Sequence, residues 1–201
     1  MGKLTDAIVN KIREFNRFIK ISDVSGLSRR YFVMNSFDGV ITILGVITGS
    51  YATGADPRFI IGAGLGASLA MGISGFTGAY LVEKAERSRM YKALEQAMLT
   101  QLDKSIHFKA SRFASFWVAF VDGASPLMSA ILALSPFFLS LLDIIPTQLS
   151  FLLSLGFIMA ILLTLGIFLA KISREKMVVS VIRMMVIGLA TALISLMIGG
   201  L

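Results

Sequence analysis

The sequence predicts an all-α, polytopic membrane protein with five transmembrane helices, preceded by an N-terminal amphipathic helix at the membrane interface. The chain has 201 residues, of which 56% are hydrophobic and 15% are charged. A soluble domain is typically about a quarter charged. The mean hydropathy of +0.81 also favours a membrane protein. The absence of cysteine excludes disulfides and thiolate metal ligands.

Residues 1–28 are expected to form a cytoplasmic amphipathic helix followed by a linker. Within residues 3–20, apolar side chains recur every three to four positions among basic ones. This pattern is typical of a helix that lies on an anionic membrane surface. A helix that packs on another part of the same protein would show the same pattern. The stretch 22–28 is expected to end this helix and to lead into the first span.

The remaining residues, 29–201, form one predicted membrane domain with no separate soluble domain. Its spans are bounded by turn residues such as the Asp56–Pro57 pair and by charged residues such as Glu83 and Lys84. Each span is long enough to cross a hydrocarbon core of about 30 Å. The predicted spans are 31–53, 58–82, 112–141, 149–170 and 177–200, with a cytoplasmic helical segment at 83–111.

The distribution of Lys and Arg predicts a cytoplasmic N-terminus and an external C-terminus. Seven basic residues precede the first span, seven lie between the second and third, and three lie between the fourth and fifth. The loops on the opposite side carry only Arg58. Basic residues collect on the cytoplasmic side of membrane proteins. Topology and anionic lipid therefore account for the net charge of +7, and no nucleic-acid partner is expected.

An aspartate, Asp38, lies deep inside the first predicted span. At 1.5 Å per residue it is roughly 13 Å beyond Arg29, near the middle of the hydrocarbon core. A carboxylate at this depth costs about 3 kcal/mol on insertion scales, so such a residue usually faces inward and has a function. On a helix, Asp38 shares a face with small or polar residues and one thioether: Met34, Asn35, Thr42, Gly45 and Gly49.

The second and third spans supply matching features. The second span carries six glycines and Met71, so it is suited to pack closely against the first and to line a narrow polar path. The third span carries Asp122, roughly 15 Å beyond Arg112 by helical rise. Because Asp38 and Asp122 lie at similar depth and each precedes glycine, a parallel internal repeat is one interpretation. Pro126 is expected to free backbone carbonyls beside Asp122.

These residues suggest a weak site for a divalent metal ion that passes through as cargo, with no resident cofactor. Carboxylate prefers Mg, Ca or Mn, and a thioether shifts the preference toward iron. An intramembrane carboxylate also takes up a proton as the metal leaves, which would couple metal movement to a proton gradient. Glu83 and Glu86 lie where a cation would reach the second span from the cytosol. The candidate metal-contacting residues are Asp38, Met71, Asn35, Thr42, Glu83, Glu86 and Asp122.

Other interpretations of the same residues stay open. Methionine in a membrane helix more often serves packing, and Arg183 either forms a salt bridge with an intramembrane aspartate or reaches the cytoplasmic interface. Asp103 and His107 have the i, i+4 spacing of a metal chelate, or belong to a solvated helix face. An intramembrane aspartyl protease would use Asp38 and Asp122 as a pair sharing a proton, but its Gly-x-Gly-Asp motif is absent. A non-transporting membrane scaffold is a further possibility.

Three stretches of the sequence carry a family resemblance: RYFVMNSFDGVITILGVITG, GAGLGASLAMGISGF and FVDGASPL. They are similar to the vacuolar iron transporter (VIT-type) family, and the resemblance covers essentially all five spans. It matches Asp38 to the family's intramembrane aspartate. It implies a homodimer of five-helix subunits and a path for Fe²⁺ or Mn²⁺ between them, with proton antiport removing the metal from the cytosol. The subunits would meet through the glycine-rich first and second spans.

The chain departs from the family pattern in two places. The family has methionine after the second-span serine and a Glu-Tyr pair after the glycine. This sequence has Leu69 after Ser68, and Ile73-Ser74 after Gly72. A short, net basic segment at 83–111 stands where the family's well-studied members have a longer acidic metal-binding domain. The chain is therefore expected to be a divergent, prokaryotic member that lies in the cell membrane.

Overall fold

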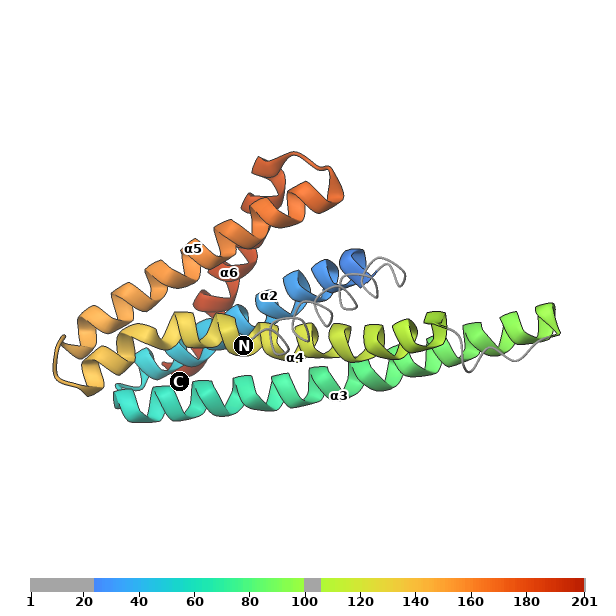
Figure 1. Ribbon diagram of the computed structural model, residues 1–201. Coiled ribbons are helices and arrows are strands. Elements are labelled where there is room, and N and C mark those ends of the chain that lie inside the picture. Colours follow the sequence, from blue (N-terminus) through green and yellow to red (C-terminus); the bar gives the residue numbers. More distant parts are fainter. Residues whose placement is uncertain (1–23, 100–105, 201) are drawn as a thin grey trace, which may run out of the picture. The chain divides into compact units, whose positions relative to one another are not determined.

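Figure 1 shows the computed structural model, which describes residues 24–99 and 106–200. These ranges contain no strand and five helices, each long and apolar enough to cross a membrane. The predicted all-α fold with five spans is thereby confirmed, whereas the predicted amphipathic helix at 3–20 lies outside the described residues. The helices are α2 (Val24–Ala52), α3 (Pro57–Met98), α4 (Ile106–Leu141), α5 (Thr147–Ser173) and α6 (Met177–Gly199).

Several helices extend beyond the predicted spans at their polar ends. α2 begins at Val24, inside the stretch expected to be a linker, and α3 continues past Glu83 to Met98. Helical hydrogen bonds form within one segment and do not depend on the bilayer, so a helix continues into the polar region until a breaker ends it. The predicted cytoplasmic segment is therefore helical up to residue 98 and again from residue 106.

The turn between α2 and α3 follows directly from its sequence. Gly54 adopts a positive φ of 65°, a conformation that glycine enters without steric cost. The Asp56 carboxylate accepts a hydrogen bond from the Arg58 backbone N–H at 2.8 Å, which caps α3. Pro57 occupies the first helical position, where its missing N–H is not needed. This short turn makes α2 and α3 a helical hairpin.

The chain divides into two compact units, each built from parts of several helices. Of the described residues, the first unit comprises 24–31, 75–99 and 106–122, and the second comprises 32–74 and 123–200. In the first unit, Val24 of α2 packs with Ala114 and Val118 of α4. In the second unit, α5 and α6 pack against each other near the turn that joins them and diverge toward their other ends (Figure 1). The core of the second unit draws on all five helices and includes Val40, Leu44, Ile60, Leu134, Phe137, Ile158 and Ala192.

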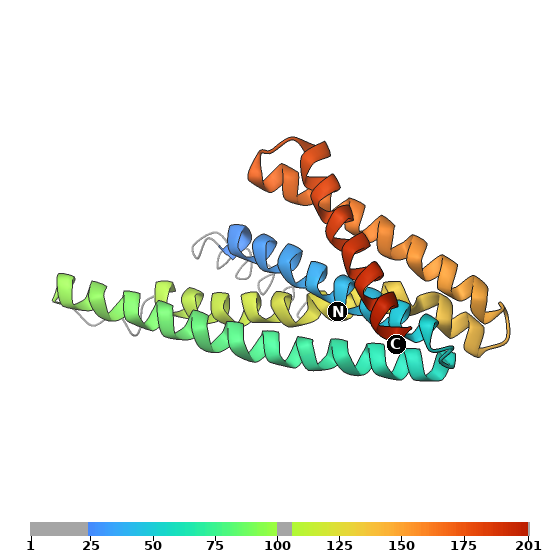
Figure 2. The ribbon, with the colours of Figure 1, turned by 180° about the vertical axis from the view of Figure 1, so that it is seen from behind.

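Small residues allow close helix contacts within the second unit. A Cβ placed on Gly166 of α5 would lie 2.9 Å from the Val181 Cα of α6. A Cβ on Gly199 would lie 2.9 Å from the Gly49 carbonyl oxygen, so the end of α6 lies against the end of α2 (Figure 2). Close approach through small residues is the usual mode of helix association in membranes, where hydrophobic burial between helices gains little.

Candidate functional site

The glycine after Asp38 fixes how α2 meets α4 in the second unit. A Cβ placed on Gly39 would lie 2.7 Å from the Cα of Pro126, 2.9 Å from its carbonyl oxygen and 2.5 Å from the Ser129 Oγ. Only glycine leaves room for this backbone contact. Gly39 and Val40 are buried, whereas Asp38 is exposed on the surface of the single subunit. Asp38 therefore faces away from the helices of its own chain, and its role as a metal ligand stays a prediction.

Two other candidate residues, Thr42 and Met71, contact each other one helical turn after Asp38. The Thr42 hydroxyl of α2 donates a hydrogen bond to the Met71 sulfur of α3 at 3.5 Å. Thioether sulfur is a weak acceptor, and the hydroxyl oxygen keeps its own acceptor capacity. One turn before Asp38, the Met34 side chain is 55% exposed, and Asn35 is half-buried. The second unit thus brings oxygen and sulfur donors from two helices to one region.

The glycines of α3 fall into two sets. Gly64 and Gly72 are buried, and a Cβ on Gly72 would lie 2.7 Å from the Gly123 carbonyl oxygen of α4. Gly62 and Gly66 are exposed, and a Cβ on either would have no atom within 4 Å. The first set therefore packs α3 within the subunit. The second set leaves an open, small-residue surface on the same helix.

Asp122, in the first unit, has a different environment from Asp38. Its side chain is buried, with 4% exposed. A Cβ on Gly75 of α3 would lie 2.7 Å from the Asp122 Oδ2, so this glycine makes room for the carboxylate. Asp122 and Glu83 both interact electrostatically with the Tyr31 phenol. The first unit thus gathers acidic and phenolic groups from α2, α3 and α4, and the two aspartates of the possible repeat are not equivalent.

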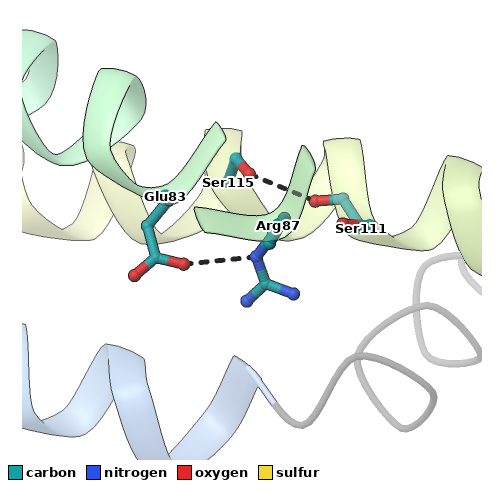
Figure 3. Close-up of polar contacts among 4 residues, drawn as sticks. All are labelled: Glu83, Arg87, Ser111 and Ser115. Carbon is teal, nitrogen blue, oxygen red and sulfur yellow. Dashed lines mark hydrogen bonds and ion pairs between the residues drawn. The ribbon is translucent and has the colours of Figure 1, made fainter. Parts of the chain in front are cut away.

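Glu83, one of the two acids expected at the cytosolic end of the second span, forms an ion pair within α3. Its Oε2 lies 3.2 Å from the Nε of Arg87, and Figure 3 shows this ion pair. The side chains are only 13% and 19% exposed, respectively. Glu86 is exposed. A cation that approaches Glu83 therefore meets a carboxylate already neutralised by a guanidinium, whereas Glu86 is open to solvent.

Arg183 reaches the polar end of α6 and forms an ion pair there. Its Nη1 lies 3.7 Å from the Oε2 of Glu175, and both side chains are substantially exposed. Of the interpretations open for this arginine, the structure supports the interfacial one.

Within residues 24–99 and 106–200, no group of three or more His, Asp or Glu side chains is arranged to hold a metal ion. Asp103 and the side chain of His107 lie outside the described residues, so their chelate stays a prediction.

Three residues around these groups did not emerge from sequence reasoning. Arg87 was detectable, because it follows Glu83 by four residues, the spacing of a helical ion pair. Tyr31 is the first residue of the first predicted span and follows two arginines. Membrane proteins commonly place an aromatic anchor at this level, so the pattern gives no sign that Tyr31 lies near Asp122. The sequence marks Gly39 only as the glycine that follows Asp38, and nothing in it identifies Gly39 as the contact with α4.

Residues 91–200, more than half of the chain, match the VIT family. The chain belongs to the VIT family. As a VIT-family protein with five apolar helices, it is an integral, multi-pass membrane protein of a metal-ion transporter family. It is 37% identical over 184 residues to an uncharacterized protein of Methanocaldococcus jannaschii, with 89% of this chain and 92% of that relative covered. No solved structure matches the chain significantly. The archaeal relative fits a divergent, prokaryotic type of VIT-family protein.

Proposed function

We propose that this protein is a homodimeric transporter that moves Fe²⁺ or Mn²⁺ out of the cytosol along a path between its two subunits. One observation carries the proposal: Asp38, far inside the first span, is exposed on the surface of the single subunit. An aspartate facing lipid at that depth costs about 3 kcal/mol. A second copy placed over this surface would remove the carboxylate from lipid.

The α2–α3 hairpin that carries Asp38 also offers an open helix surface for such a dimer. The exposed Gly62 and Gly66 of α3 would allow close approach of a second helix. A two-fold axis presents the same patch on both subunits. A dimer built on this face would therefore bring two Asp38 carboxylates toward one path. Two such carboxylates match the charge of one divalent cation.

The donors nearest this path fit a borderline divalent metal. Asp38 would supply the anionic oxygen, with Asn35 and Thr42 as neutral oxygen ligands. Met71 would supply a soft thioether that contacts Thr42. Oxygen ligands alone suit Mg, Ca or Mn, and added sulfur favours iron. Few charged ligands make binding weak, as transport requires, because the ion must leave again.

The remaining candidates would serve passage from the cytosolic end. Glu86 is exposed and would meet the cation first, followed by Glu83, whereas the buried Asp122 would lie off a path between the subunits. The cytosolic side is assigned by the excess of Lys and Arg around residues 84–112 and before residue 31. Protonation of Asp38 competes with metal binding, because both need the carboxylate lone pairs. A proton gradient would then drive metal release by antiport.

Family membership favours transport over the intramembrane protease, because the VIT family is a transporter family. The settings of the two aspartates differ as well: Asp38 is exposed and Asp122 is buried. An aspartyl dyad needs two carboxylates in one shared environment. Nothing in the described residues specifically favours the scaffold.

The proposal is tested by metal flux into proteoliposomes that contain the full chain. Asp38→Asn keeps the size of the side chain and removes its charge, and we expect Fe²⁺ and Mn²⁺ flux to fall at least tenfold. Asp143→Asn is the matched control. Asp143 is exposed in the α4–α5 turn with a φ of 56°, a conformation that asparagine also adopts readily. Flux that is unchanged by Asp38→Asn refutes the assignment, and no flux in the unmodified protein favours the scaffold.

A further inference from the structure

A cavity of about 310 Å³ lies between α3 and α4 in the first unit, outside the candidate metal path. Its lining includes three basic side chains, Lys84 and Arg87 from α3 and Arg112 from α4, and no carboxylate. Pockets of about 300 Å³ or more hold small ligands. A cavity with this charge is suited to an anion larger than a simple halide.

The three cations retain hydrogen-bonding capacity toward the cavity. Arg87 uses its Nε for the Glu83 ion pair, and a guanidinium carries further N–H donors on its terminal nitrogens. The Lys84 ammonium lies 5.7 Å from the centroid of the Tyr80 ring, a cation–π contact that positions it and uses none of its N–H donors. Arg112 is exposed, and its side chain presents the fork geometry that binds phosphate oxygens.

Hydroxyl and aromatic groups complete the lining. Ser88, Ser111 and Ser115 contribute hydroxyls. The Ser115 hydroxyl donates to the Ser111 carbonyl oxygen at 3.3 Å (Figure 3), so its proton is already committed. The rings of Tyr91 and Phe108 meet edge to face, with centroids 5.6 Å apart, and form an apolar wall. Cations, hydroxyls and an aromatic wall together match a phosphate group that is attached to an organic part.

We propose that this cavity binds a phosphate ester, carried by an anionic phospholipid headgroup or by a soluble organic phosphate. The position of the cavity fits either source, because its residues lie where the second predicted span ends and the third begins. Anionic lipid attracts basic groups at this level of a membrane. The inference does not depend on metal transport, since none of the cavity residues belongs to the candidate metal path.

The test measures binding to the purified full chain by native mass spectrometry. One arm adds anionic phosphatidylglycerol, with zwitterionic phosphatidylcholine, whose headgroup has no net charge, as the comparison, and the other adds glycerol 3-phosphate. We expect phosphatidylglycerol or glycerol 3-phosphate to bind, and Lys84→Gln/Arg112→Gln to weaken that binding at least tenfold. Lys92→Gln is the matched control, because Lys92 is exposed on α3 and does not line the cavity.

The two arms separate the possible sources of the phosphate. Retention of phosphatidylglycerol without glycerol 3-phosphate binding assigns a lipid, and the reverse assigns a soluble phosphate. Arg112→Lys serves as a folding-safe second variant, since it keeps the charge and loses the fork, and we expect a smaller loss of binding. The proposal is overturned if phosphatidylcholine binds equally well. It is also overturned if neither phosphate compound binds, or if the double variant binds as the Lys92→Gln control does.

Discussion

The contact beneath Asp38 gives the most direct test of the structure, through the substitution Gly39→Ala. Ordinary van der Waals contact begins near 3.4 Å, and the added methyl would lie 2.7 Å from the Pro126 Cα. The methyl carbon would therefore be about 0.7 Å too close to a backbone atom of α4, and no side-chain rotation can relieve this clash. α2 and α4 must separate instead. Overpacking of this kind costs about 1–3 kcal/mol, and the helix propensity of alanine recovers less than about 1 kcal/mol.

The assay is thermal unfolding of the full chain in detergent, and size-exclusion chromatography measures how much folded protein remains after heating to each temperature. We expect Gly39→Ala to lower Tm, by about 2–4 °C for each kcal/mol in a chain of this size. Gly26→Ala, on the same helix, is the control, because no atom lies within 4 Å of its added Cβ. It gains helix propensity without a clash, so its Tm should stay level or rise. A Gly39→Ala protein as stable as Gly26→Ala would refute the packing of α2 on α4.

Two further substitutions separate the roles of the candidate ligands. Met71→Leu removes the thioether at nearly constant volume, so Fe²⁺ flux into proteoliposomes should fall several-fold while Mn²⁺ flux is largely kept; equal losses for both metals would assign Met71 to packing. Glu83→Gln leaves the mostly buried Arg87 without its carboxylate partner and should lower stability by on the order of 1 kcal/mol, measured as Tm. Glu86→Gln is the comparison, because the Glu86 carboxylate is exposed. If Glu83 also contacts the metal, Glu83→Gln lowers the flux at low Mn²⁺ more than Glu86→Gln does.

The spans were predictable because their signal is strong and local. Long apolar runs separated by Asp56–Pro57 and by charged residues leave little ambiguity about which segments cross a bilayer. The ends were less predictable. Hydropathy marks where the chain leaves the hydrocarbon, whereas the helix of α3 ends later, at Met98, where its backbone hydrogen bonding stops.

The orientation of α2 could not be obtained in the same way. In a soluble helix the apolar face identifies the core, but lipid and core are equally apolar in a membrane, so periodicity gives no direction. Gly39 and Gly45 look alike in the sequence. Only Gly39 lies against the backbone of another helix, because Pro126 and Ser129 of α4 lie opposite it. That tertiary contact, and not the pattern on α2, decides that Asp38 faces away from its own subunit.

The exposed position of Asp38 also links the proposed dimer to its cargo. Two Asp38 carboxylates brought to one axis repel each other when both are charged, and a divalent cation or protons relieve that repulsion. Metal binding and dimer formation must then strengthen each other by the same factor, because coupling free energies between two binding events are reciprocal. Mn²⁺ should therefore shift the protein toward dimer in analytical ultracentrifugation at neutral pH. Asp38→Asn should form the dimer without metal, because the repulsion is gone. A dimer that is insensitive both to Mn²⁺ and to Asp38→Asn would place Asp38 away from the two-fold axis.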